Sequence, residues 1–277
     1  MSDKLIPNGE FVKISNYKVH VLRDGDINKP TLVFMSGSGT VAPVYDFKIL
    51  YKKLVENFRI IVIEKFGYGY SDIFEYPCDI DSLVDLQKQV LEKLNEKGQY
   101  ILIPHSASGI EAIRWKQKYP NEIKAIIGID MATPLTYKNW TNEQVEKRIK
   151  LMQKSRKFGL YKILSSLSNR SLTNEEILQQ KYLRNRNAFN ICYINEAKEI
   201  LNNSNKVEKN GNIRCPTLLF VSNGKQTSAN WTKCQQEFAK IMDAKLVTYN
   251  CGHYIHYYKS EEMSKEIINF IKGLKWA

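Results

Sequence analysis

Residues 100–109 read Tyr100-Ile-Leu-Ile-Pro-His-Ser-Ala-Ser-Gly109, and they indicate the architecture expected for the whole chain. Their apolar run predicts a buried strand, and the small residues that follow predict a tight turn into a helix, with Ser106 at the apex. A serine in such a turn is lifted out of the sheet, and its neighbours must be small because larger side chains would collide across the turn. The general pattern is Gly-x-Ser-x-Gly. Here Pro104 and Ser108 occupy the two glycine positions, although the residues after the serine are still small.

Outward from this turn, short apolar segments alternate with amphipathic ones. The periodicity predicts strands at 11–14, 17–22, 31–35, 59–64, 100–103, 125–130, 217–221 and 245–249, and helices at 45–57, 80–97, 109–119, 229–242 and 260–275. The first two strands are expected to form an antiparallel hairpin. Continuous apolar strands separated by helices indicate an α/β fold, with a mostly parallel central sheet flanked by helices on both faces.

One segment interrupts this alternation. Residues 134–214 are polar, rich in Asn, Lys, Ser and Glu, and predict several helices without a buried strand. We therefore expect a core built from residues 1–133 and 215–277, with a helical lid, 134–214, inserted after the sixth strand. The length of 277 residues is consistent with one domain that carries an insertion. The aromatic residues of the lid, among them Tyr137 and Trp140, are interpreted as its own core.

The net charge of +12 is concentrated in this lid. Residues 134–214 carry 16 Lys and Arg against 7 Glu, a net +9, whereas the remainder carries 25 against 22, a net +3. A basic segment can attract nucleic acid, anionic lipid or an acidic substrate. A solvated helical face is the favoured interpretation of such a charge run, so no nucleic-acid partner is expected.

No apolar run approaches the roughly 18 to 20 residues that span a bilayer, so no membrane insertion is expected. The first residues lack the pattern of a secretory signal, which favours a cytoplasmic location.

Five scattered cysteines contain no Cys-x-x-Cys pair and are expected to be reduced. His253 and His256 are three residues apart, but no nearby carboxylate or cysteine completes a metal set, so we expect no metal. The oligomeric state is left open.

Three further motifs accompany the Ser106 turn. They are Ser36-Gly-Ser-Gly39 after the third strand, Glu64-Lys-Phe-Gly-Tyr-Gly-Tyr-Ser71 after the fourth, and Gly252-His253 near the C-terminus. In this order they resemble the His-Gly-x-x, Asp-x-x-Gly-x-Gly-x-Ser and Gly-His motifs of the α/β-hydrolase superfamily, and the resemblance runs over nearly the whole chain. It implies the α/β-hydrolase fold.

Within that resemblance, Ser106 is the nucleophile and His253 the general base, because a serine hydroxyl is a poor nucleophile until an imidazole accepts its proton. Most members place an acid after the strand that follows the lid, but residues 218–228 contain no carboxylate. Asp130 ends the strand before the lid, a position to which some members move the acid, and it could orient the His253 ring. Alternatively, Asp130 caps its loop, and Asn223 or water orients His253.

The resemblance also implies an oxyanion hole made by the backbone N–H groups of Ser38 and Ala107. Together these residues predict a serine hydrolase that cleaves a small carboxylic ester through an acyl-Ser106 intermediate, without a cofactor. A serine nucleophile argues against epoxide hydrolysis and haloalkane dehalogenation, which need an aspartate. Three alternatives remain open: an acyltransferase or aminopeptidase-type amide hydrolase with the same three groups, a binding protein that has lost catalysis, or a lid that binds nucleic acid or an anionic membrane.

Overall fold

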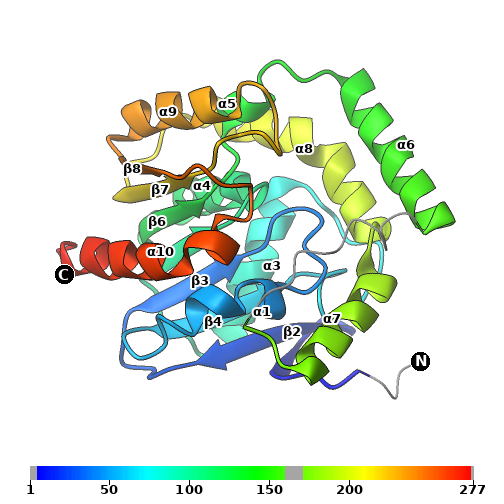
Figure 1. The fold of residues 1–277 in the computed structure, drawn as a ribbon, viewed down its shortest axis with the longest axis horizontal. Helices are drawn as coiled ribbons and strands as arrows, with labels where there is room; N and C mark the ends of the chain where they lie inside the picture. The colour runs from blue at the N-terminus through cyan, green and yellow to red at the C-terminus, as the bar shows by residue number, and fades with distance from the viewer. Residues whose placement is uncertain (1–4, 160–170, 276–277) are drawn as a thin grey trace.

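A single sheet forms the centre of the molecule. The computed structural model describes residues 5–159 and 171–275, and in these residues eight strands lie in the order β1-β2-β4-β3-β5-β6-β7-β8 (Figure 1). Their bounds are β1 (Glu10–Ile14), β2 (Tyr17–Asp24), β3 (Thr31–Met35), β4 (Arg59–Glu64), β5 (Tyr100–Pro104), β6 (Ile123–Ile129), β7 (Thr217–Val221) and β8 (Lys245–Thr248). The pairings of β2 with β1 and β4 are antiparallel, and all the others are parallel. The mostly parallel sheet predicted from the apolar strands is therefore confirmed.

Helices cover both faces of the sheet. On one face, a buried apolar cluster includes side chains of α3 (Ile80–Lys93), α4 (Ser108–Lys118) and α9 (Trp231–Met242). On the other face, a second cluster includes side chains of α1 (Pro43–Asp46), α2 (Lys48–Tyr51) and α10 (Ile255–Lys272). Every residue of β3, β5 and β7 is buried between these layers. Apolar and polar side chains therefore do not alternate along these strands.

The chain between β6 and β7 is helical in its described part. It contains α5 (Pro134–Tyr137), α6 (Asn142–Phe158), α7 (Asn174–Asn187) and α8 (Ile191–Lys209). In Figure 1, α5 lies at the top, α6 and α7 lie on the right, and α8 runs inside α6. Helix α6 packs on α8 through a small apolar cluster of its own, formed by Val145, Ile149, Met152, Ile194 and Ala197. Residues 160–170, which belong to the predicted lid, lie outside the described residues. The domain boundaries stay a prediction.

Two predicted helices differ from the structure. The single helix expected at 45–57 is wrong: α1 and α2 are separate, and Phe47, with ψ near −7°, ends the first and begins the second. The chain then turns through buried Leu54 and Phe58, because it must reverse before β4. The closing helix begins at Ile255 rather than 260, because a kink at Lys259 (φ −130°) separates its first turn from the rest.

Asp46 links the helical segment to the body of the protein. Its Oδ1 accepts hydrogen bonds from the Tyr257 hydroxyl of α10 and from the Gln180 amide of α7, the latter at 3.2 Å. The side chain is buried, and this burial raises the pKa of Asp46 to about 6, although the Tyr257 hydrogen bond opposes the shift. At neutral pH the Asp46 carboxylate is therefore ionised while it is buried beside α7. This buried charge lowers the free energy of unfolding.

We expect Asp46→Asn to raise the free energy of unfolding at pH 7 by up to about 3 kcal/mol, because the amide keeps an acceptor for Tyr257 and removes the buried charge. The folded pKa of Asp46 lies above the unfolded value, so the folded state holds its proton more tightly. The contribution of Asp46 to the free energy of unfolding of the wild type therefore falls as pH rises from about 4 to about 6. Below pH 4 the carboxyl is protonated in both states, so the variant should no longer be more stable than the wild type.

Urea unfolding of both proteins at pH 4 and pH 7 measures this difference. The exposed Asp243→Asn is the control for loss of a surface charge. An equal gain at both pH values would contradict the assignment to Asp46 ionisation.

Candidate active site

Ser106 lies at a strained turn between β5 and α4. Its φ is 55°, in the left-handed region that residues other than glycine seldom adopt, and this matches the sharp turn expected of a nucleophile. The Ser108 hydroxyl bridges the turn to β3, donating to the Met35 carbonyl at 2.8 Å and accepting from the His105 N–H at 3.0 Å. The serine in the second glycine position of the motif therefore stabilises the turn through hydrogen bonds.

Two glycines allow other segments to approach this turn closely. A Cβ atom at Gly37 would lie 2.5 Å from the Ser106 Cβ, so the loop after β3 can contact the nucleophile turn only with a glycine there. A Cβ atom at Gly109 would lie 2.1 Å from the Ala132 carbonyl oxygen, in the loop after β6. The chain thus brings three strand ends together around Ser106.

Asp130 and His253 are joined directly. Asp130 follows β6, is fully buried, and has its Oδ2 2.6 Å from His253 Nδ1. Its other oxygen accepts hydrogen bonds from the Ser222 N–H at 2.9 Å and from the Trp231 indole N–H at 2.8 Å. With Nδ1 donating to the carboxylate, the Nε2 atom of His253 is left as an acceptor.

The pairing of β6 with β7 explains how Asp130 reaches this position. Ile129 is in register with Phe220, so the end of β6 lies beside the end of β7, where the superfamily usually carries its acid. The Asn223 amide, considered as an alternative partner for His253, donates instead to Asn250 Oδ1 at 3.2 Å. Trp231 had no sequence signal, because it is the first residue of a helix and reaches Asp130 only in the folded chain.

The remaining histidines near the site are buried and uncharged. His105 contacts the His253 backbone carbonyl through Nε2 at 3.3 Å, and its ring centroid lies 4.6 Å from that of His253. Burial lowers the pKa of His105 well below its usual range, and the neighbouring His253 adds to the effect. Burial also lowers the pKa of His256, to about 3. The His105 ring packs against His253, and the His256 ring packs against His105 with the ring centroids 5.4 Å apart.

Ser106 and His253 line one cavity of about 310 Å³, together with Ser38 and Ala107. Within the described residues, no hydrogen bond joins the Ser106 hydroxyl to His253. Such bonds are often long in enzymes without bound substrate, and rotation about the Cα–Cβ bond of Ser106 is the smallest movement that changes the separation.

The backbone at Ser38 and Ala107 leaves two donors available. Neither N–H group donates to an acceptor in the described part of the chain, and both residues line the cavity. Ala107 immediately precedes the first residue of α4, where the helix dipole favours negative charge. A negatively charged oxygen bound in the cavity could therefore be stabilised by these two groups.

A buried charged network borders the cavity, and sequence analysis did not predict it. Lys65 Nζ lies 2.6 Å from Glu111 Oε1 and 3.2 Å from Glu196 Oε1, and both carboxylates line the cavity. The Tyr68 hydroxyl donates to Glu196 at 2.6 Å, and Gln87 donates to Glu111 at 2.7 Å. Burial raises the pKa of Glu196, Glu111 raises it further, and Lys65 opposes both effects.

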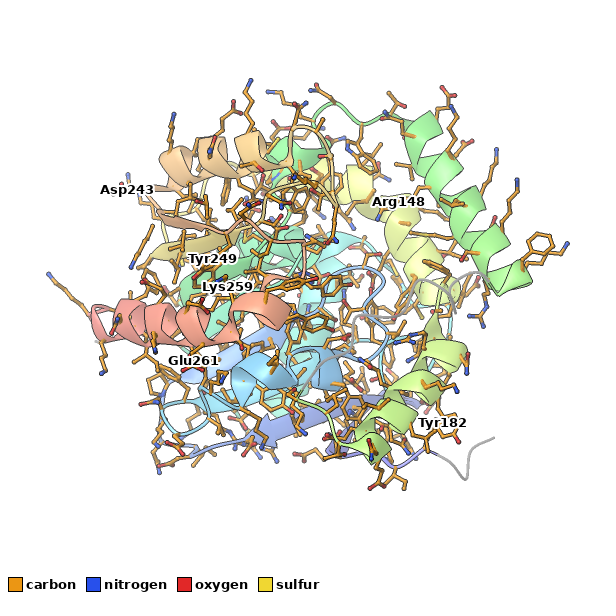
Figure 2. All side chains as sticks on the ribbon, in the orientation of Figure 1. Arg148, Tyr182, Asp243, Tyr249, Lys259 and Glu261 are labelled. Carbon is orange, nitrogen blue, oxygen red and sulfur yellow. The ribbon has the colours of Figure 1, made fainter. Side chains whose placement is uncertain are left out.

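The segment 134–214 supplies much of the cavity wall. Tyr137, Trp140, Val145 and Met152 line it, so two aromatic residues interpreted as lid core also face the cavity. Arg148, labelled in Figure 2, lies on α6 with its guanidinium 5.7 Å from the Trp140 ring. Because these contacts depend on how the helices pack, the sequence alone did not reveal them.

The sequence of the chain is similar to that of a curated protein. No protein-family profile matches the chain. The uncharacterized protein YbdG of Bacillus subtilis (strain 168) is 38% identical over 176 residues, which make up 63% of this chain and 53% of that protein. The chain thus spans about half the length of this curated relative.

Solved structures match over nearly the whole chain. A putative lipase from Acinetobacter baumannii AYE has a TM-score of 0.76 at 17% identity, covering 96% of this chain and 91% of that one. MGS-M2, an α/β-hydrolase enzyme from a Medee basin deep-sea metagenome library, has a TM-score of 0.72 at 19% identity, covering 97% and 99%. Other matching structures include an epoxide hydrolase and a haloalkane dehalogenase, so the shared fold accommodates several reactions.

The search for membrane-crossing helices gave a negative result. Among residues 5–159 and 171–275, no helix combines the length and apolar character needed to cross a bilayer.

The charged network predicts a large effect on stability. We expect Lys65→Met to lower the free energy of unfolding by about 3 to 5 kcal/mol, because it leaves Glu111 and Glu196 buried without their cation. Lys147→Met is the matched control, since Lys147 pairs with Glu143 in an exposed ion pair worth at most about 1 kcal/mol. Urea unfolding at pH 7 measures both. Equal, small losses would show that the network contributes no more than a surface pair.

Proposed function

Because the chain has the α/β-hydrolase fold, we propose that it is a serine hydrolase that cleaves a small carboxylic ester. The observation that carries this proposal is the 2.6 Å contact between the buried Asp130 carboxylate and His253, beside a cavity that Ser106 also lines. An imidazole fixed by a carboxylate at Nδ1 is the group that a serine hydroxyl needs as a base. A molecule of about the size of a small ester would fit a cavity of about 310 Å³.

In the first half of the reaction, Ser106 Oγ attacks the acyl carbon while His253 Nε2 takes the hydroxyl proton. The carbonyl oxygen becomes negatively charged and accepts hydrogen bonds from the N–H groups of Ser38 and Ala107. As the tetrahedral intermediate collapses, the bond to the alcohol oxygen breaks. His253 returns the proton to this oxygen, and the alcohol leaves an acyl-Ser106 ester behind.

In the second half, water replaces the alcohol. His253 takes a proton from water, and the hydroxide attacks the acyl carbon. The bond to Ser106 Oγ breaks, and the proton returns to the serine while the carboxylic acid is released. Asp130 orients the ring throughout, and the Ser222 N–H and the Trp231 indole N–H hold its carboxylate in place.

The identity of the nucleophile supports acyl chemistry over the other reactions of this fold. Ser106 stands at the turn where epoxide hydrolysis and haloalkane dehalogenation require a carboxylate. An acid at the end of β6 is compatible both with acyl chemistry and with epoxide or haloalkane hydrolysis. Its position therefore does not distinguish these reactions. Acyl transfer and amide hydrolysis would use the same three side chains, and they differ only in acceptor or leaving group.

The test is hydrolysis of aryl esters with short and long acyl chains, with aminoacyl arylamides measured alongside. We expect ester turnover, and we expect Ser106→Ala to abolish it and Asp130→Asn to lower kcat by about 10⁴-fold, because the amide favours the wrong tautomer of His253. Mass spectrometry of enzyme mixed with a slowly hydrolysed ester should find the acyl group on the peptide that contains Ser106.

Asp243→Asn is the control, because Asp243 is exposed and far from the cavity on the edge of the molecule in Figure 2. It should leave turnover unchanged. Amide turnover without ester turnover would replace the proposal with an aminopeptidase-type reaction. No turnover and no acylation on any substrate would favour a binding protein, and a nearly unimpaired Asp130→Asn would remove that residue from the mechanism.

A further inference from the structure

Helix α6 presents two different faces. Its buried residues, Val145, Ile149, Met152 and Ser155, lie on one side, and the first three pack towards α8. The opposite side, here called the outer face, carries Lys147, Lys150, Leu151, Lys154, Lys157 and Phe158. Leu151 and Phe158 are 65% and 68% exposed, the largest exposed fractions among the large apolar side chains of the described residues. Figure 1 shows α6 at the margin of the molecule, and in Figure 2 its long side chains project outward.

The outer face is basic. Of the six Lys and Arg on the helix, Arg148 lines the cavity and Arg156 donates to the Ala188 carbonyl. The four lysines that remain on the outer face stand against the two exposed glutamates of the helix, a net charge of +2. Lys147 and Lys150 lie 2.8 and 3.9 Å from Glu143 and Glu146, in exposed pairs that balance two of the four lysine charges. Lys154 and Lys157 form no ion pair with any described residue. The outer face therefore combines uncompensated positive charge with two large apolar side chains.

We propose that the outer face of α6 docks the protein on an anionic lipid surface. The helix would lie parallel to the surface, with Leu151 and Phe158 entering the boundary between headgroups and acyl chains. The lysines are long enough to keep their ammonium groups at the level of the lipid phosphates while their methylene groups cover apolar surface. Charge attraction and apolar burial thus act on the same face of one helix.

The composition of this face favours lipid over two other partners. Nucleic acid would satisfy the lysines through its phosphates but would leave Leu151 and Phe158 without an apolar partner. A second copy of the chain, docked through the same face, would bring together two surfaces that both carry a net positive charge. An anionic lipid surface is the partner that matches both the charge and the apolar side chains.

The docking face and the cavity share this helix. Val145, Arg148 and Met152 of α6 line the cavity, so docking would hold the cavity wall against the lipid surface. An ester that partitions into that surface would then meet the cavity at high local concentration. The docking itself does not depend on the proposed hydrolysis, and it is measured without any substrate.

Sedimentation with vesicles of phosphatidylcholine, with or without phosphatidylglycerol, tests the proposal. We expect binding only when phosphatidylglycerol is present, and weaker binding at high salt. Lys150→Gln combined with Lys154→Gln should weaken binding about 30-fold, at a contribution of about 1 kcal/mol per lysine. Leu151→Ser should weaken it about tenfold through lost apolar burial.

The matched control is on α9, where Lys233→Gln combined with Lys240→Gln removes the same charge and Ile241→Ser removes a half-exposed apolar side chain. These variants should bind vesicles like the wild type.

Absence of vesicle binding by the wild type, or an equal loss of binding in the α9 variants, would overturn the proposal. So would binding of duplex DNA that Leu151→Ser leaves intact, or self-association through the same face. Urea unfolding midpoints equal to that of the wild type show that the α6 variants are folded. Turnover of a water-soluble aryl ester is measured separately, so that failure of the proposed hydrolase function and failure of docking are distinguished.

Discussion

The contact between Asp130 and His253 is the interaction on which the rest of the site depends. A fully buried carboxylate is costly unless donors surround it, and here the backbone immediately after β7, the indole of α9 and the imidazole all supply them. Those donors come from three segments after the helical insertion. The site therefore forms only when the second part of the chain has closed against the first, so the fold itself positions the histidine.

Close approach between backbone segments is the second constraint on the site, and it explains which residues occupy the motif positions. Gly37 and Gly109 bring the loops after β3 and β6 against the turn that holds Ser106. Ser108, which departs from the usual glycine, makes a hydrogen bond to β3 that glycine could not make. Substitutions within a motif can thus preserve geometry by another physical means.

The sequence predicted those parts of the structure that depend on local pattern. The apolar period located the strands of the sheet, and the order of short motifs located Ser106 and His253, while Asp130 was found at the end of the strand before the predicted lid. The sequence could not predict that Trp231 donates to Asp130, or that Lys65 lies between Glu111 and Glu196, because those contacts join residues that are far apart along the chain. It also merged α1 and α2, since the break at Phe47 follows from burial of the turns before β4. The catalytic roles and the extent of the lid stay predictions.

The pair of glutamates that shares Lys65 has a thermodynamic consequence for ligand recognition. Two carboxylates, those of Glu111 and Glu196, share the single charge of Lys65. The pKa of Glu196 is therefore sensitive to any further charge that enters the cavity. A cationic ligand in the cavity would lower the pKa of Glu196, and an anionic ligand would raise it. Any proton exchanged with the medium on association would make the measured heat depend on the ionisation enthalpy of the buffer, which calorimetry in two buffers detects.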